Sequence, residues 1–121
     1  MNLSAALSAN RIIPVVTAYS VESTVKLTEV LAAAGMSLVE ITLRTDDALA
    51  SIEAVKSALP GIMVAAGTVT GAPDVSRARD AGADFLVSPG IGGELIEAAQ
   101  TQSIPILPGV ATASEVMLGM S

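Results

Sequence analysis

Short runs of apolar, mostly β-branched residues alternate along the chain with longer segments in which apolar residues recur every three or four positions. The short runs have the length of buried strands, and the longer segments have the period of helices that bury one face. Successive runs begin about 20 to 26 residues apart, which leaves room for one helix in each interval, as in repeated β–α units with parallel strands. The expected strands are Ile12–Ala18, Leu38–Arg44, Ile62–Val69, Asp84–Ser88 and Ile104–Leu107.

Helix signals also lie outside the intervals between these strands. Before the first strand, an amphipathic segment that packs Leu3, Ala6 and Leu7 predicts a short N-terminal helix. After the last strand, Thr112 and Glu115 have the spacing of a capping box, which predicts the start of a further helix.

The helix after the second expected strand has the clearest apolar stripe, and Thr45 or Asp46 is expected as its N-cap. The stripe consists of Ala48, Ile52, Val55 and Leu59. Two other helices are expected to end in an Ala-Gly pair, with Gly35 and Gly82 just beyond the last helical turn, where glycine is common.

Two folds accommodate five β–α units in a chain of 121 residues. One is the open, doubly wound sheet of the flavodoxin type, which would be complete at this length. The other is an eight-fold β/α barrel, which has roughly 250 residues and would be incomplete. A phosphate-binding loop of the open-sheet proteins would follow the first strand, but no glycine lies between Arg11 and Ala34. We therefore expect an α/β fold of the (β/α)8 TIM-barrel family, a single partial barrel domain over residues 1–121 with a short N-terminal helix and about the first five β/α units, lacking the C-terminal strands.

Composition excludes several classes of function. Six Lys and Arg residues stand against twelve Asp and Glu residues, and this net charge of −6 argues against nucleic acid, whose backbone requires clustered cations. Histidine and cysteine are absent, which excludes disulfides, thiolate nucleophiles, imidazole bases and the usual zinc sites. No apolar run approaches the ~20 residues of a membrane span. We expect a cytoplasmic protein with no metal and with no nucleic-acid or membrane partner.

The second expected strand has polar residues on one face. Glu40, Thr42 and Arg44 alternate with apolar residues and therefore share that face. Parallel strands are normally covered on both faces, where a carboxylate is costly unless it is paired or functional. On an extended strand Glu40 and Arg44 would lie roughly 13 Å apart, too far for a simple contact. The face therefore predicts a site that binds one small ligand from two depths; a solvated strand of an antiparallel sheet is the alternative explanation.

Further candidate residues occur at the ends of the next two strands. Thr68 supplies a hydroxyl after the third strand, and Pro89 follows the fourth, at the edge where the active sites of barrels lie. Tight packing and turn formation would explain both residues without a ligand. The two lysines of the chain, Lys26 and Lys56, fall within expected helices, and we expect both to be solvated at the surface.

Five segments occur in a specific order and spacing from about Arg11 to the last residue. They are VEITLRT at 39–45, AGTV at 66–69, SPG at 88–90, PILPGV at 105–110 and SEVMLGM at 114–120. Together they resemble the 2-keto-3-deoxy-6-phosphogluconate aldolases, which are also described as 4-hydroxy-2-oxoglutarate aldolases.

The resemblance implies a class I aldolase on an eight-fold barrel, a cytoplasmic homotrimer that cleaves 2-keto-3-deoxy-6-phosphogluconate to pyruvate and glyceraldehyde 3-phosphate. A further candidate substrate is 4-hydroxy-2-oxoglutarate. It also implies that Glu40 is the general acid/base, that Arg44 and Thr68 hold the pyruvyl carboxylate, and that Pro89 lines the same pocket. The implied partner is a small 2-keto acid, and no cofactor is implied.

The resemblance places the Schiff-base lysine on a sixth strand and the phosphate site near the seventh and eighth, all beyond Ser121. Without an amine to form the iminium, Glu40 has no activated carbon to deprotonate, so we expect this chain alone to be inactive. Three explanations stay open: the sequence is part of a longer enzyme, it is a fragment completed by another chain, or it is a half-barrel that assembles through the open edges of its sheet. Another phosphate-binding barrel enzyme is a further alternative.

Overall fold

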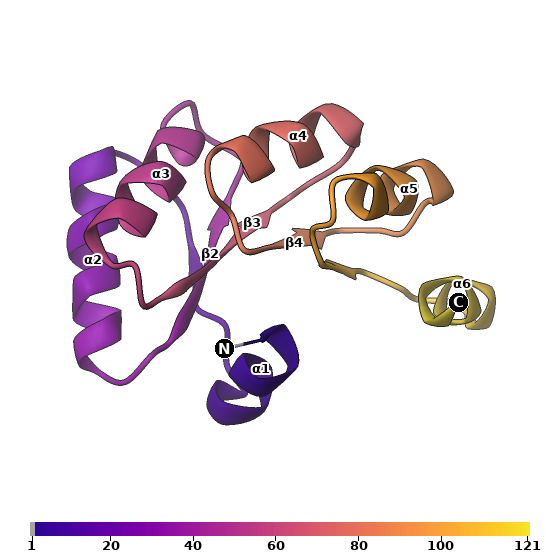
Figure 1. Cartoon of the computed structure of the whole chain (residues 1–121), viewed down its shortest axis with the longest axis horizontal. Coiled ribbons are helices and arrows are strands. Elements are labelled where there is room, and N and C mark those ends of the chain that lie inside the picture. Colours follow the sequence, from indigo (N-terminus) through magenta and orange to yellow (C-terminus); the bar gives the residue numbers. More distant parts are fainter. Residues whose placement is uncertain (1) are drawn as a thin grey trace.

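The computed structural model describes residues 2–121, which form six helices and one sheet of five parallel strands. The strands are β1 (Val15–Val16), β2 (Leu38–Thr42), β3 (Met63–Gly67), β4 (Phe85–Ser88) and β5 (Ile106–Pro108). The helices are α1 (Leu3–Asn10), α2 (Val21–Ala33), α3 (Ala48–Ala58), α4 (Ala72–Asp80), α5 (Gly93–Thr101) and α6 (Ala113–Met120). The strands lie side by side in chain order, and all four neighbouring pairs are parallel. The expected alternation of strand and helix is confirmed (Figure 1).

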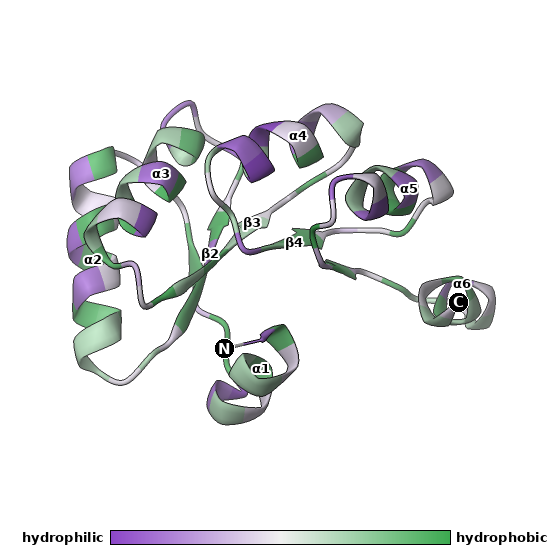
Figure 2. Ribbon diagram, in the orientation of Figure 1, coloured by the Kyte–Doolittle hydropathy of each residue, from purple (hydrophilic) through white to green (hydrophobic). Residues whose placement is uncertain are grey.

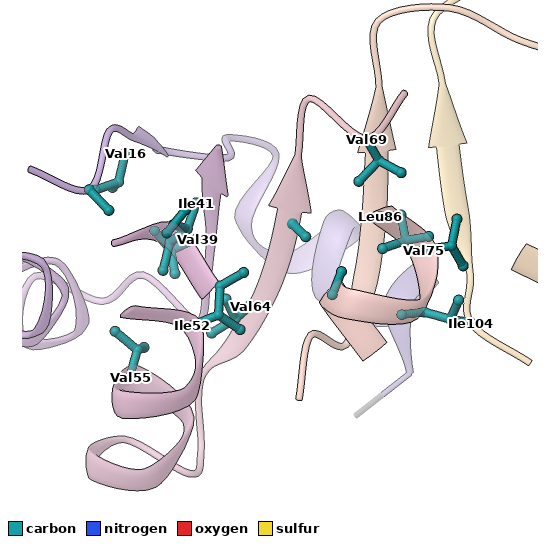
Figure 3. Packing of buried hydrophobic residues seen from close by; sticks show 14 of the residues in the cluster. Val16, Val39, Ile41, Ile52, Val55, Val64, Val69, Val75, Leu86 and Ile104 are labelled. Atoms are coloured by element: carbon teal, nitrogen blue, oxygen red, sulfur yellow. The ribbon is translucent and has the colours of Figure 1, made fainter. Parts of the chain in front are cut away.

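The main core lies between the sheet and the helices of its outer face. This cluster includes Val39 and Ile41 of β2, Val64 of β3 and Leu86 of β4. Ile52 of α3 lies beside Val64, and Val75 of α4 lies beside Leu86 (Figure 3). Figure 2 shows that the strands are mainly hydrophobic, whereas helices α2 to α5 also carry hydrophilic residues. The outer face of the sheet is therefore buried by amphipathic helices, as in a β/α barrel.

The opposite face of the sheet is partly covered by α1, which lies on the other side of the strands from α3 and α4 (Figure 1). Four fully buried apolar residues lie outside the main core cluster: Ala6, Leu38, Ala65 and Phe85. Ala6 belongs to α1, and the others belong to strands. Ser37, just before β2, donates its backbone N–H to Asn10 Oδ1 at 3.3 Å and so ties the end of α1 to the sheet. Of the residues expected to pack in this helix, Ala6 is buried, and Leu3 and Leu7 are half-buried.

All five strands are shorter than the apolar runs that predicted them. β1 contains only Val15 and Val16, and β2 ends at Thr42. The prediction that Arg44 lies in the second strand is therefore wrong, because the backbone turns once Leu43 N–H has donated to Gly67 O at 2.9 Å.

Helix ends follow the sequence signals in three cases and depart from them in one. Thr112 and Glu115 form the expected capping box of α6, and Gly35 and Gly82 have φ values of 99° and 93° after α2 and α4. The expected cap of α3 is wrong. Its N-cap is Asp47, which forms no side-chain cap hydrogen bond. The Thr45 hydroxyl instead donates to Ala18 O, just after β1, at 2.6 Å.

The two lysines differ in their surroundings. Lys26 is exposed and pairs with Glu22 at 3.0 Å on the same helix. The prediction of a solvated Lys56 is wrong, because its Nζ lies 2.8 Å from Asp84 Oδ2 and donates to Ile62 O at 3.1 Å. Asp84 also accepts the backbone N–H of Val64 at 2.8 Å. These contacts lie where β3 and β4 begin, at the end of the sheet that stabilises β/α barrels rather than the end that carries chemistry.

Ser51 is expected to destabilise α3, because its hydroxyl is fully buried and has no hydrogen-bond partner within residues 2–121. Replacing Ser51 by alanine removes this unsatisfied group and should raise the free energy of unfolding by about 1 kcal/mol beyond the gain in helix propensity. Urea denaturation followed by circular dichroism measures the change. The matched control is Ser57→Ala at an exposed position of the same helix, and an equal gain from both variants would contradict the assignment.

Large apolar side chains are exposed along the two free edges of the sheet. At the first edge they belong to β1, its flanking residues and α2, and at the last edge to the segment after β5 and α6. These residues are Ile12, Val15, Tyr19, Leu27 and Val30, and Val110, Val116, Met117, Leu118 and Met120. Within residues 2–121 no helix has the length and hydropathy needed to cross a membrane.

Candidate active site

A cleft of about 240 Å³ opens at the carboxyl ends of the strands. Its lining comes from β1 to β4 and the turns that follow them: Val15, Thr17, Glu40, Thr42, Arg44, Thr68, Val87, Ser88 and Pro89. All four residues singled out from the sequence line this cleft, although up to 49 positions separate them. The parallel register explains why, since Glu40 lies opposite Val15 on one side and Ala65 on the other.

Glu40 is the buried acid of the cleft. Its residue is only 9 % exposed, and within residues 2–121 neither of its carboxylate oxygens accepts a hydrogen bond. Burial raises the pKa of the Glu40 carboxyl above its ordinary value, and the positive charge of Arg44 offsets part of that increase. A desolvated carboxyl with a raised pKa binds a proton more readily than a solvated one, which suits a general acid/base.

Arg44 lies in the turn after β2, with an exposed guanidinium at the mouth of the cleft. It forms no salt bridge with any carboxylate among the described residues, so its charge reaches Glu40 without a direct contact. The sequence prediction that the two residues are not a contact pair agrees with this arrangement. A guanidinium placed in this way offers a planar pair of donors to a carboxylate ligand.

Thr68 follows β3 in a left-handed conformation, with φ of 59°. This backbone is unusual for a β-branched residue and is maintained by its neighbours. Next along the chain, Val69 donates its backbone N–H to Val87 O at 3.2 Å, which ties the turn to β4. The strained residue thus directs its side chain to the cleft that Arg44 and Glu40 also line.

Pro89 is held in place by the end of β5. Gly109 donates its backbone N–H to Ser88 O at 2.9 Å, and a Cβ at this glycine would lie only 2.3 Å from Pro89 O. The Ser88 hydroxyl donates to Gly90 O at 2.7 Å and stabilises the same turn. Pro89 is therefore positioned by backbone packing between two neighbouring strands.

Thr17 is a cleft residue that the sequence did not single out. It lies two positions beyond Val15, which pairs with Glu40, and alternation places both residues on the same side. Alternation along the first strand could have indicated that Thr17 faces the cleft. Because β1 has only two residues, the sequence did not show that Thr17 shares the face of Val15.

A larger hollow of about 550 Å³ lies between the first turns of α4 and α5. Its only ionisable side chain is Glu94, and the cleft around Glu40 therefore has the stronger chemistry. Within residues 2–121 no group of three His, Cys, Asp or Glu side chains is arranged to hold a metal ion.

The model of the family described as KDPG and KHG aldolase matches residues 3–121. The chain belongs to this family. A 2-dehydro-3-deoxy-phosphogluconate aldolase of Dickeya dadantii is 39 % identical over 114 residues, which are 94 % of this chain and 54 % of that protein. A KHG/KDPG aldolase of Escherichia coli K12 is 38 % identical with the same coverage. The chain thus spans about half the length of the curated relatives it matches.

Solved structures of the aldolase family have the same fold. The 2-keto-3-deoxy-6-phospho-gluconate aldolase of Zymomonas mobilis superposes with a TM-score of 0.92 and 37 % identity, covering 99 % of this chain and 58 % of that one. The KDPG aldolase of Legionella pneumophila, described with pyruvate captured as a covalent carbinolamine intermediate, gives the same values. The predicted family and the partial TIM-barrel fold are both confirmed.

Proposed function

We propose that this chain provides the acid–base and carboxylate-binding half of a Schiff-base aldolase site. The observation that carries the proposal is the buried, unpaired carboxyl of Glu40 in a cleft that Arg44 and Thr68 also line. The carbinolamine of pyruvate in the Legionella relative supports the same chemistry for this family member.

The proposed roles follow from the chemistry of each group. Arg44 and the Thr68 hydroxyl bind the carboxylate of the 2-keto acid and so fix the direction of its carbonyl. Glu40 transfers protons when the carbinolamine forms and loses water, and it removes or returns the proton on the carbon next to the iminium. Pro89 lines the wall of the same cleft.

The amine of the Schiff base is proposed to come from residues outside this sequence. Lys56 is bound to Asp84 where β3 and β4 begin, at the opposite end of the sheet from the cleft. Lys26 lies on α2, pairs with Glu22, and does not line the cleft. Because neither lysine reaches Glu40, we propose that the chain alone is inactive and that a longer protein or a second chain completes the site.

The remaining parts of the proposal rest on family resemblance. The substrate is 2-keto-3-deoxy-6-phosphogluconate, cleaved to pyruvate and glyceraldehyde 3-phosphate, with 4-hydroxy-2-oxoglutarate as a second substrate. The active protein is a cytoplasmic homotrimer, and residues 1–121 form part of a single barrel domain.

A chimera tests the proposal directly. Residues 1–121 are joined to the part of the Dickeya dadantii aldolase that follows the matched region, and the product is treated with pyruvate and borohydride. We expect a reduced pyruvate adduct on one lysine beyond the junction, and none on the 121-residue chain. A chimera that folds, as judged by circular dichroism and gel filtration, but forms no adduct would refute the proposed function.

Arg44 gives a prediction for substrate binding. In the chimera, Arg44→Met should raise KM for the 2-keto acid about 10- to 100-fold, because a charge-assisted interaction with the carboxylate is lost. Steady-state kinetics measures the change. The matched control is Arg79→Met, which removes an exposed arginine of α4 that does not line the cleft. Equal KM values for the two variants would exclude Arg44 from carboxylate binding.

A second candidate function is a non-catalytic half-barrel that assembles through its open edges. The exposed apolar side chains along β1 and α6 favour it, because unpaired strand edges associate readily in water. Light scattering of the 121-residue chain decides, and a stable monomer would exclude this alternative.

A further inference from the structure

Gly67 is the last residue of β3 and lies beside the side chain of Glu40. A Cβ built on Gly67 would lie 2.0 Å from Glu40 Oε1, 2.7 Å from its Cδ and 2.9 Å from its Cγ. These three atoms are the nearest to such a Cβ, and all of them belong to Glu40. The carboxyl therefore occupies the space that a side chain at position 67 would need.

The direction of Glu40 explains why position 67 matters. The backbone of Glu40 lies opposite Ala65, whereas Gly67 lies opposite Thr42, two positions nearer the carboxyl ends of the strands. The Glu40 side chain thus leans along the sheet toward the mouth of the cleft. It lies over Gly67 and lines the cleft together with Arg44 and Thr68.

Backbone conformation does not account for glycine at this position. Gly67 is a strand residue without a left-handed φ, whereas the next residue, Thr68, has φ of 59° and carries a side chain. Gly67 O accepts the N–H of Leu43 at 2.9 Å, a bond that any residue could form. The requirement for glycine arises from the space taken by Glu40.

We propose that Gly67 is a positioning residue for Glu40. Because Gly67 has no side chain, it leaves free the space in which the Glu40 carboxyl lies at the mouth of the cleft. The proposal rests on the proposed function for its catalytic consequence. Gly67→Ala keeps the backbone bond to Leu43 and leaves Thr68 unchanged. The Glu40 side chain is flexible, so it moves away while the strand stays in place.

Two measurements on Gly67→Ala test the proposal. In the chimera, kcat for aldol cleavage should fall about 100-fold, because a displacement of about 1 Å at the reacting groups lowers the rate by about this factor. KM should change by less than threefold, which corresponds to about 0.6 kcal/mol. In the 121-residue chain, carbon NMR titration should show the Glu40 pKa moving back toward its ordinary value, because the displaced carboxyl is better solvated. An unchanged pKa together with an unchanged kcat would overturn the proposal.

Two further variants separate a displaced carboxyl from a damaged fold. Gly61→Ala adds a methyl group just before β3, at a position where φ is not left-handed and where, apart from its chain neighbours, no residue of the described chain has an atom within 4 Å. It should leave both kcat and the Glu40 pKa unchanged. Any fall in melting temperature caused by Gly67→Ala should disappear in a Glu40→Ala background, since the three nearest atoms that the new methyl group would meet are then absent. A fall that persists there would overturn the proposal. A wild-type chimera without a pyruvate adduct would refute the proposed function. The NMR titration of the 121-residue chain would still test whether Gly67 positions the Glu40 carboxyl.

Discussion

Glu40→Gln in the chimera is expected to lower kcat for aldol cleavage about 10²- to 10⁴-fold, the usual contribution of a general acid/base. Glutamine has nearly the same shape and keeps the close fit against Gly67, but it cannot carry the proton. Cleavage of 2-keto-3-deoxy-6-phosphogluconate, coupled to detection of pyruvate, measures the loss. The matched control is Glu53→Gln, which neutralises an exposed carboxylate on α3. Full activity of Glu40→Gln would show that Glu40 is not the general acid/base.

The same variant should increase stability at neutral pH. The Glu40 pKa is raised in the folded chain by burial, so the folded state holds this proton more tightly than the unfolded state does. The free energy of unfolding should therefore decrease as the pH rises from the ordinary glutamate pKa through the raised one, and then level off. Glu40→Gln should not show this decrease. The contribution of Glu40 is the difference between the wild-type and Glu40→Gln free energies of unfolding, measured by urea denaturation across that pH range. Parallel pH profiles would show that Glu40 carries no desolvation cost.

Phe85→Ala is expected to destabilise the chain by about 3 to 5 kcal/mol, which is a large part of the stability of a small domain. Phe85 is the only phenylalanine and the largest fully buried side chain, and it lies on β4 outside the main core cluster. Its removal would leave a cavity that the surrounding strands cannot fill. Urea denaturation monitored by circular dichroism measures the loss.

The only tyrosine provides the control for this substitution. Tyr19 is 83 % exposed, so Tyr19→Ala should change the free energy of unfolding by no more than about 0.5 kcal/mol. Phe85→Leu should fall between the two alanine variants, because it keeps part of the buried volume. Similar urea midpoints for Phe85→Ala and Tyr19→Ala would mean that burial of Phe85, outside the main core cluster, does not contribute to stability.

The sequence predicted the order of the elements because periodicity and helix signals are local properties. The capping box of Thr112 and Glu115 and the left-handed Gly35 and Gly82 required only neighbouring residues, and the structure has all of them. The polar face of β2 was equally visible, since alternation alone places Glu40 and Thr42 together.

Features that depend on distant residues were not accessible in this way. The alternation of β2 continues beyond its last ladder bond, so the sequence did not show that Arg44 lies in a turn. Lys56 was expected in solvent because its partner, Asp84, is 28 positions away. The close contact of Gly67 with Glu40 depends on the register between two strands, which no single segment encodes.

From β2 onward, each strand of this sheet pairs with the strand that precedes it in the chain. During synthesis, every new strand therefore emerges beside a partner that is already available, and its assembly does not depend on later residues. Glu40, Arg44 and Thr68 all belong to the first three units, so the part of the cleft that they line can form before the fourth and fifth units are synthesised.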